Sequence, residues 1–244
     1  MRWIYLSPHL DDAVLSAGGF IYEQTKSGTP VEIWTFMAGA PSDTEYSPFA
    51  ELLHRQWGFS SARETVQARR EEDNNAASLV GASTVHFDFL DCIYRRDENG
   101  EWPYYDIYLP PQKMDADLPR QIADAIIPRL NPDDVLVCQL SVGSHIDHVL
   151  VRQAAELLGR TLLYDIDVPY IFYKPEELAL KSAGMKENAH AVTETGLKAW
   201  QEAVLAYKSQ LPVLGEAMST PEDARESIQS YWGERKGIYL FQRI

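Results

Sequence analysis

Short apolar runs alternate with segments of helical periodicity along the first part of the chain. Four of these runs are expected to be strands, at residues 3–6, 31–37, 85–89 and 135–140. Helices are expected between them, over residues 14–28, 61–81 and 118–130. Because strands joined by helical crossovers lie parallel, the alternation predicts an α/β fold with a mostly parallel sheet covered by helices.

The remainder of the chain is less regular. In that part we expect helices from His148 to Gly159, over 194–208 and from Thr220. We also expect strands at 162–164, 170–173 and 237–242. Two segments rich in turn-forming and polar residues, 38–60 and 91–116, are expected to be long loops. No internal repeat or linker divides the sequence, so we expect a single domain over residues 1–244.

The charge of the chain argues against two classes of partner. Lys and Arg number 22 and Asp and Glu number 36, which gives a formal net charge of −14. Such a balance repels phosphate backbones and anionic lipid surfaces, so neither nucleic acid nor a membrane is expected as a partner. The apolar run at the N-terminus is too short for a signal peptide, and Cys92 and Cys138 have no metal or disulfide spacing. We expect a soluble, cytoplasmic protein in which both cysteines are packing residues.

Chemically capable side chains follow the first and the fourth expected strand. The loop after residue 6 carries His9, Asp11 and Asp12, and the loop after residue 140 carries His145 and His148. If the strand order is 3-2-1-4, these two strands are neighbours where the order reverses, which is where ligands bind in open α/β sheets. The two loops are therefore expected to converge on one site.

Two imidazoles and one carboxylate from this set could bind a metal ion and leave a position open for water, as in hydrolytic zinc sites. A further carboxylate could then take the proton of that water. His9 and Asp12 are three residues apart, as are His145 and His148, so each pair could face one ion from one helical turn. Each pair alone also has an ordinary interpretation, because acidic residues at a helix start commonly interact with the helix dipole. The joint placement of both pairs favours the metal site.

Other chemistries lack their motifs. The sequence has no G-x-G-x-x-G, no Walker loop and no G-x-S-x-G, so neither a nucleotide cofactor nor a serine nucleophile is expected. Gly18 and Gly19 lie inside the first helix and are expected to let it pack closely on the sheet. Aromatic residues of the long loops could stack on sugar faces or anchor the loops, namely Trp57, Trp102, Tyr104 and Tyr105.

Two motifs, in this order, resemble those of the LmbE/PIG-L-like N-acetylglucosaminyl deacetylases. The family signature A-H-P-D-D-E corresponds to the segment from Pro8 to Ala13, and H-P-D-H corresponds to residues 145–148. Softer matches are Arg69 to Glu72 with the family's R-x-x-E helix, the segment ending at Asp91 with its substrate-side aspartate, and Ser209-Gln210 with a late family helix. The resemblance covers most of the chain and implies a Rossmann-like α/β fold with helices on both faces of the sheet.

The resemblance also implies a role for each matched residue. His9, Asp12 and His148 would bind Zn²⁺ or another divalent metal ion. Asp11 would be the general base, and His145 would stabilise the oxyanion of the tetrahedral intermediate. Asp147 would orient a metal-binding imidazole, and Arg69 and Asp91 would hold sugar hydroxyls. The family's Pro, Glu and Pro are replaced by Leu10, Ala13 and Ile146; no ligand or base is lost, but Ala13 removes a carboxylate near the site.

The activity that the resemblance implies is metal-dependent removal of the acetyl group from an N-acetylated sugar of the N-acetylglucosamine type, which releases acetate and a free amine. The partner would be a small N-acetylated sugar or glycoconjugate, and a homo-oligomer is compatible with the sequence. Two alternatives stay open: a metal-dependent hydrolase of another amide or ester, and a non-catalytic sugar-binding relative. The presence of Asp11 favours an enzyme.

Overall fold

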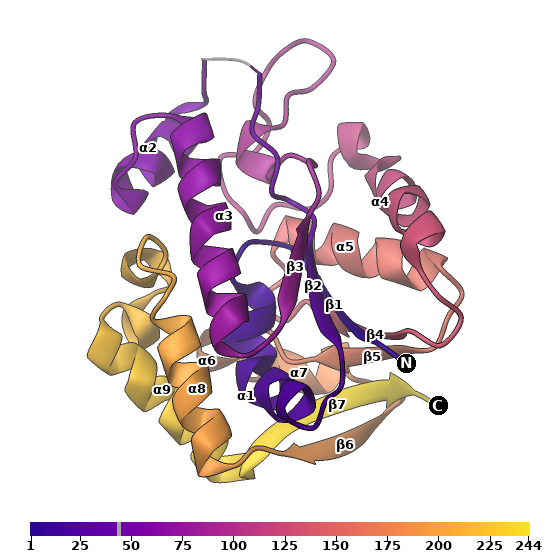
Figure 1. Ribbon diagram of the computed structural model, residues 1–244. Coiled ribbons are helices and arrows are strands. Elements are labelled where there is room, and N and C mark those ends of the chain that lie inside the picture. The colour runs from indigo at the N-terminus through magenta and orange to yellow at the C-terminus, as the bar shows by residue number, and fades with distance from the viewer. Residues whose placement is uncertain (43–44) are drawn as a thin grey trace.

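The structure, a computed structural model, describes residues 1–42 and 45–244. Its centre is a seven-stranded sheet in the order β3-β2-β1-β4-β5-β7-β6 (Figure 1). The strands are β1 (Trp3–Ser7), β2 (Val31–Thr35), β3 (Ser83–His86), β4 (Val135–Gln139), β5 (Leu162–Asp165), β6 (Met185–Ala191) and β7 (Gly237–Arg243). Strands β1 to β5 pair in parallel, whereas β7 pairs antiparallel with both β5 and β6. The predicted mostly parallel sheet is confirmed, and the 3-2-1-4 order on which the expected convergence of the two loops was conditional is the order observed.

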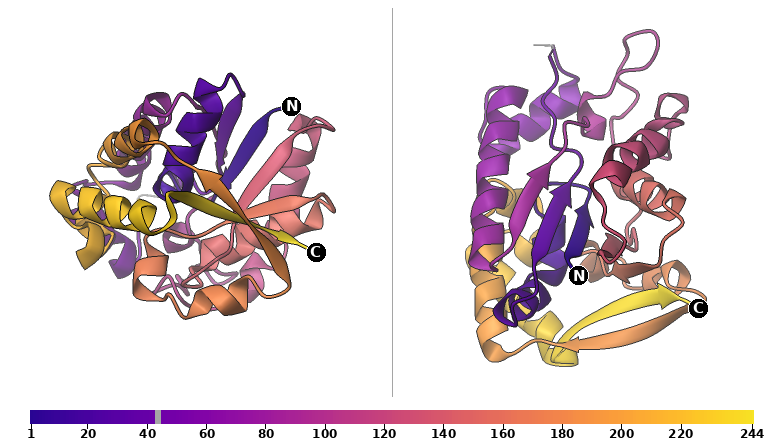
Figure 2. Two further views of the ribbon diagram at one scale, coloured as in Figure 1. Left: turned by 90° about the horizontal axis from the view of Figure 1, so that it is seen from below. Right: turned by 45° about the vertical axis from the view of Figure 1, so that its right-hand side comes forward.

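Helices cover both faces of this sheet, as predicted. They are α1 (Asp12–Lys26), α2 (Pro48–Trp57), α3 (Ala62–Leu79), α4 (Leu118–Ile126), α5 (Ile146–Leu157), α6 (Tyr170–Tyr173), α7 (Glu177–Lys181), α8 (Glu194–Val204) and α9 (Pro221–Arg235). One face carries α4 and α5, and the other carries α1, α3 and α8, with α9 packed on α8 (Figures 1 and 2). Among the described residues, none of the helices has the length and apolarity to cross a membrane.

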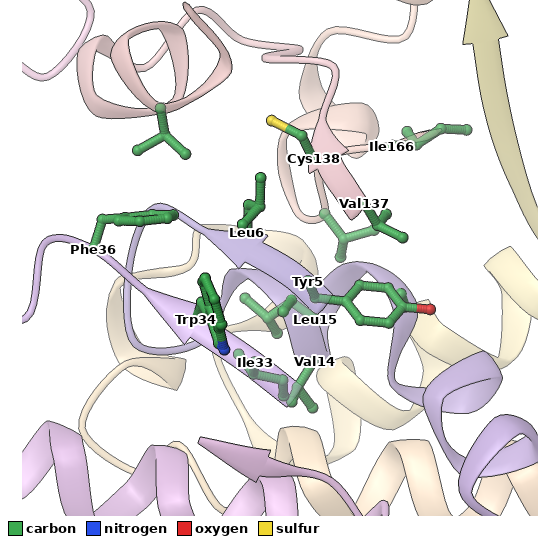
Figure 3. Packing of buried hydrophobic residues seen from close by; sticks show 14 of the residues in the cluster. Tyr5, Leu6, Val14, Leu15, Ile33, Trp34, Phe36, Val137, Cys138 and Ile166 are labelled. Carbon is green, nitrogen blue, oxygen red and sulfur yellow. The ribbon is translucent and has the colours of Figure 1, made fainter. Parts of the chain in front are cut away.

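The core between α1 and the sheet fixes the position of the strand ends. Val14 and Leu15 of α1 lie against side chains of β1, β2 and β4, among them Tyr5 and Ile33 (Figure 3). These side chains are at most 1% exposed, and burial of each large aliphatic residue contributes about 1.5–3 kcal/mol. Because α1 is held against the strands in this way, the loop between β1 and α1 is fixed at the carboxyl end of the sheet.

The glycine pair of α1 packs against a helix and not against the sheet, so that expectation was wrong. A Cβ atom on Gly18 would lie 2.5 Å from Cδ1 of Trp200 in α8, and one on Gly19 would lie 2.9 Å from Cε3 of the same ring. The indole N–H of Trp200 donates a 2.7 Å hydrogen bond to the carbonyl of Val14. The absence of side chains at these two positions therefore lets α8 approach the backbone of α1.

We expect Gly18→Ala to lower the free energy of unfolding by about 1–2 kcal/mol. The added Cβ forces the buried Trp200 ring to shift, and overpacking of this kind outweighs the gain of up to about 1 kcal/mol in helix propensity. The matched control is Gly233→Ala in α9, where a Cβ meets no atom within 4 Å. Urea denaturation of both variants tests this; a Gly18→Ala protein as stable as Gly233→Ala would contradict it.

Of the two expected long loops, 38–60 and 91–116, the first differs from the expectation; residues 43 and 44 of it lie outside the described residues. Residues 48–57 of the first expected loop form α2. Its N-cap is Ser47, whose hydroxyl accepts a 2.9 Å hydrogen bond from the N–H of Ala50. Gly58 ends this helix at φ +82°. These cap signals were available in the sequence, but the prolines and the glycine were interpreted as a loop. The second segment, 91–116, contains only short 3-10 helices, as a predominantly irregular loop would.

Three strand assignments need correction. Residues 170–173 form the short helix α6, because the N–H of Ile171 bonds to the carbonyl of Asp167. The third strand ends at His86, three residues earlier than expected, with isolated bridges beyond it. Strand β6 was not predicted, because it is an edge strand with Lys, Glu and Asn, which are rare in strands, and most of it is exposed. The final strand is confirmed as β7.

Candidate active site

The loops after β1 and β4 meet at the carboxyl end of the sheet, as the strand order requires. His9 lies in the loop before α1, and Asp12 is the first residue of that helix. His145 is the N-cap of α5, and His148 lies in its first turn. The two pairs therefore do not each span one helical turn as expected. His9 faces Asp12 because the loop turns back, with the N–H of His9 donating a 2.7 Å hydrogen bond to Asp12 Oδ2.

The structure brings all eight predicted site residues together. A cavity of about 460 Å³ is lined by six of them, His9, Asp11, Asp12, Arg69, Asp91 and His145. Asp147 and His148 lie beneath this surface, with side chains that are 0% exposed. Residues separated by more than a hundred positions in the sequence thus form one cluster, which is the arrangement that the sequence motifs predict.

Three potential metal-binding atoms converge at the base of the cavity. Asp12 Oδ2 lies 3.1 Å from His9 Nδ1 and 3.3 Å from His148 Nε2. The His148 Nε2 atom is buried and makes no hydrogen bond. Ligand atoms around a tetrahedral zinc ion are about 3.3 Å apart, because zinc binds nitrogen and oxygen at about 2.0–2.1 Å. The donor set and its spacing therefore fit a divalent metal ion.

The other nitrogens of the two histidines meet buried carboxylates. His9 Nε2 lies 3.2 Å from Asp147 Oδ2, and His148 Nδ1 lies 2.9 Å from Asp167 Oδ1. When each outer nitrogen donates its proton to the carboxylate, the inner nitrogen has a free lone pair for a metal ion. Without an ion, burial lowers the pKa of His148, but Asp12 and Asp167 outweigh this effect and raise it to about 9.

The tautomer of His145 follows from a contact with the backbone. Its Nδ1 accepts a 3.1 Å hydrogen bond from the backbone N–H of Asp147. Burial, together with His9 and His148, keeps the pKa of His145 well below its usual value, so the ring is neutral. Its single proton is therefore on Nε2. His9, His145 and His148 do place ligand atoms within 4.8 Å of one another, but a protonated Nε2 is a hydrogen-bond donor and not a metal ligand.

Asp11 lies beside this cluster without joining it. Its side chain lines the cavity, and its Oδ2 is 3.6 Å from the guanidinium of Arg69. Burial and the neighbouring Asp12 raise the pKa of Asp11 to about 6, although Arg69 opposes the shift. A carboxylate with a pKa close to neutrality can both accept and return a proton, which is the property that general acid–base catalysis requires.

Much of the remaining cavity wall is apolar. It is formed by α2 and by the segment after α8, with Phe49, Leu53, Trp57, Val213 and Leu214. The Arg69 guanidinium also lies over the Trp57 ring, 5.1 Å from its centroid. Of the aromatic residues that were considered for sugar stacking, only Trp57 lines this cavity. Tyr104 instead donates a hydrogen bond to the buried Asp115, Trp102 stacks on Arg96, and Tyr105 is 74% exposed.

Two of the three softer sequence matches are joined by hydrogen bonds. The Glu72 carboxylate accepts from both the N–H and the hydroxyl of Ser209, at 2.9 and 2.6 Å. The Ser209 hydroxyl in turn accepts from the amide of Gln210, which lines the cavity. The helix that carries Arg69 and the turn that carries Gln210 are thus linked behind the cavity wall.

Sequence reasoning missed Asp167, Tyr170 and Arg95. Asp167 follows β5 and supports His148, and the rule that directed attention to the ends of the first and fourth strands would have identified it. Tyr170 lies on the short helix that was expected to be a strand, with its ring 5.2 Å from that of His148. Arg95 lies in the long loop and contacts Asp147; no sequence motif marks it.

A second buried carboxylate near the end of β5 affects stability. Asp165 is 2% exposed, and its Oδ1 has no hydrogen-bond partner. Burial and the nearby Asp167 raise its pKa well above the usual value. The folded protein therefore holds Asp165 protonated at pH values where the unfolded chain has released the proton. The stabilising contribution is complete below about pH 4 and is lost as the pH rises through the folded-state pKa.

We expect Asp165→Asn to raise the free energy of unfolding of the metal-free protein at pH 7 by about 1–2 kcal/mol. The difference from the unsubstituted chain should become small at about pH 3, where the folded and the unfolded chain both hold the proton. Denaturant unfolding between these pH values measures it. Asp223→Asn is the control, and it should lower the free energy of unfolding at pH 7. The reason is that hydrogen bonds from Thr220 and Ser219 lower the pKa of the Asp223 carboxyl. A less stable Asp165→Asn protein at pH 7 would contradict the expectation.

The sheet, the cavity at its carboxyl end and the His/Asp cluster are together typical of metal-dependent hydrolases on an α/β fold. The profile of the PIG-L family, described as GlcNAc-PI de-N-acetylase, matches residues 4–158. The chain belongs to this family.

Individual relatives agree with this assignment. The chain is 27% identical to a 2'-N-acetylparomamine deacetylase of Niallia circulans over 248 aligned positions, which cover 89% of this chain and 84% of the relative. It is 28% identical to the zinc-inhibited form of a teicoplanin deacetylase, with a TM-score of 0.83 over 99% of this chain and 97% of that one. An N,N'-diacetylchitobiose deacetylase from Pyrococcus horikoshii, at 16% identity and a TM-score of 0.53 over 99% of this chain and 82% of that one, shares the fold.

Proposed function

We propose that this chain is a metal-dependent N-deacetylase that hydrolyses the acetamide group of an N-acetylated sugar to acetate and a free amine. The observation that carries the proposal is the convergence of His9 Nδ1, Asp12 Oδ2 and His148 Nε2 beside the cavity-lining Asp11. Family membership supports the reaction type. The relative named as a 2'-N-acetylparomamine deacetylase supports the substrate class.

Each residue of the cluster has a distinct part in this proposal. His9, Asp12 and His148 would hold the ion, with Zn²⁺ the leading candidate because two imidazoles and a carboxylate are typical zinc ligands. A divalent ion bound there supplies a Lewis acid for the acetamide carbonyl and lowers the pKa of water. Asp147 and Asp167 keep the two imidazoles in the tautomers that expose a lone pair toward Asp12.

Proton transfer falls to Asp11. Its carboxylate takes a proton from a water molecule as the water oxygen attacks the acetamide carbon. The carbonyl oxygen becomes an oxyanion, and the Nε2–H of His145 donates a hydrogen bond to it. When the carbon–nitrogen bond breaks, Asp11 returns the proton to the departing nitrogen. One carboxylate thus serves as base and then as acid, and the products are acetate and an amine.

The cavity provides both polar and apolar contacts for the rest of the substrate. Its volume of about 460 Å³ is within the usual range for small-molecule sites. Arg69 and Asp91 offer a donor and an acceptor for sugar hydroxyls, and the Trp57 ring offers a flat apolar face. The apolar wall beyond them favours a glycoconjugate with an apolar portion over a free, fully polar sugar.

The proposal is tested by metal analysis together with acetate release. We expect elemental analysis of the purified protein to find about one Zn²⁺ per chain, and acetate release from N-acetylglucosamine compounds to stop after chelation and resume when Zn²⁺ is restored. O-acetylated sugars and acetylated amines without a sugar serve as comparison substrates. Bound metal without release of acetate from any N-acetyl sugar would overturn the substrate class, and a protein with no affinity for divalent metals would overturn the ligand assignment.

A further inference from the structure

A buried arginine outside the cavity lies between two buried carboxylates. Arg95 is 9% exposed, and its Nη1 donates a 2.6 Å hydrogen bond to Asp147 Oδ1. On its other side, its Nε lies 2.9 Å from Asp115 Oδ1. Asp115 is 1% exposed and Asp147 is 0% exposed. One guanidinium therefore supplies compensating charge to both carboxylates, which matters because burial removes the screening that water provides.

Asp147 connects this arginine to the proposed metal site. Its Oδ1 accepts from Arg95, whereas its Oδ2 accepts from the N–H of Cys92 at 3.0 Å and lies 3.2 Å from His9 Nε2. With three partners arranged around it, the carboxylate has one orientation. That orientation directs the opposite nitrogen of the His9 ring, Nδ1, toward Asp12 Oδ2. The orientation of the proposed ligand His9 thus depends on the contact between Arg95 and Asp147, in which His9 itself takes no part.

The far end of the network is anchored in the long loop. Asp115 Oδ2 accepts hydrogen bonds from the hydroxyl of Tyr104 and from the N–H of Gln112. The Arg95 guanidinium also lies over the Tyr104 ring, 5.3 Å from its centroid. The same loop contributes Ile107 to the cavity wall, and the carbonyl of Ile107 accepts a 2.9 Å hydrogen bond from Ile146 at the start of α5. The loop is therefore tied to the start of α5, the segment that carries His148, through Asp147 and through Ile146.

We propose that Arg95 is a positioning residue of the metal site, which acts through Asp147 to hold the His9 imidazole in its ligand orientation. The inference rests on the proposed function, because it assumes that His9 binds the ion. It goes beyond that function in assigning the task to a loop residue that touches neither the cavity nor any of the three proposed ligands. A planar guanidinium suits this position, because it can face two carboxylates in fixed directions at once.

The test compares zinc affinity in variants of the full chain. We expect Arg95→Gln to weaken Zn²⁺ binding by about 10–100-fold, the usual cost when a partner of a metal-binding histidine is lost. Arg95→Lys keeps the charge but not the planar guanidinium that faces both carboxylates. Its Zn²⁺ affinity should therefore lie between those of Arg95→Gln and the unsubstituted chain. Competition with a chromophoric chelator measures each value, and thermal unfolding of the metal-free proteins shows whether they fold.

Arg2 provides the matched control. It also lies between two carboxylates, Glu32 at 2.8 Å and Asp134 at 2.6 Å, but at the opposite end of the strands. Arg2→Gln should therefore lower stability without changing Zn²⁺ affinity. If Arg95→Gln does not fold, Tyr104→Phe replaces it, because this change removes one hydrogen bond to Asp115 and keeps every charge; a several-fold loss of affinity is then expected.

A double-mutant cycle identifies the route of the effect. In an Asp147→Asn background, Arg95→Gln should change Zn²⁺ affinity much less than in the unsubstituted chain, because the carboxylate through which it acts is gone. Equal Zn²⁺ affinity of Arg95→Gln and the unsubstituted chain would overturn the inference, and so would an undiminished effect in the Asp147→Asn background. Failure of the unsubstituted chain itself to bind Zn²⁺ would instead overturn the proposed metal site, so the two failures are distinguishable.

Discussion

Replacement of Asp11 by Asn is expected to lower the rate of acetate release by about 10³-fold or more while Zn²⁺ remains bound. The substitution keeps the size of the side chain and removes its ability to accept a proton. The three proposed ligand atoms, on His9, Asp12 and His148, are untouched. Steady-state kinetics and elemental analysis of the same preparation measure both quantities.

The neighbouring carboxylate Asp91 is the control for this experiment. It also lines the cavity, its Oδ2 lies 3.7 Å from His9 Nε2, and it is proposed to bind sugar hydroxyls. Asp91→Asn should raise KM more than it lowers kcat, because the contact it removes is made in the ground state as well as the transition state. An Asp11→Asn protein with full activity would exclude Asp11 as the base.

Removal of the His145 imidazole is expected to lower kcat by about 10²–10³-fold with Zn²⁺ retained, as the loss of one oxyanion donor typically does. The physical reason is the tautomer: Nδ1 accepts from the N–H of Asp147, so the neutral ring presents Nε2–H. His145→Ala and His148→Ala should therefore differ in kind. We expect the first protein to keep its metal, and the second to lose both metal and activity.

The metal content of these two variants decides between two roles. If His145→Ala loses Zn²⁺ as completely as His148→Ala does, His145 is a ligand, and the grouping of His9, His145 and His148 within 4.8 Å of one another describes the site better than the set that includes Asp12. Retained Zn²⁺ with unchanged kcat would remove His145 from both roles.

The sequence predicted the centre of the sheet and the convergence of the site for the same physical reason. Apolar runs such as 135–140 mark strands that are buried on both faces, and parallel strands joined by helices have few alternative orders. Once β1 and β4 are neighbours, the loops that carry His9 and His145 must meet. Local patterns and a topological rule were sufficient here because the residues lie directly at strand ends.

Features that depend on contacts between distant segments could not be predicted in this way. The Gly18-Gly19 pair looks the same in sequence whether its neighbour is a strand or the Trp200 ring. Arg95 looks like any charged loop residue until the loop folds and places it between Asp115 and Asp147. The tautomer of His145 depends on one backbone N–H. These properties arise from tertiary packing, which single-sequence periodicity does not describe.

The separation between the cluster and the apolar wall has a consequence for engineering. Asp11, Asp12 and His148 are held at the central strands, whereas Phe49, Leu53 and Leu214 come from α2 and a turn outside the sheet. A combinatorial library at these three wall positions would therefore change the range of substrates without disturbing the groups assigned to bond cleavage. The fold thus offers a scaffold on which selectivity can be altered independently of turnover, and directed evolution could begin from these positions.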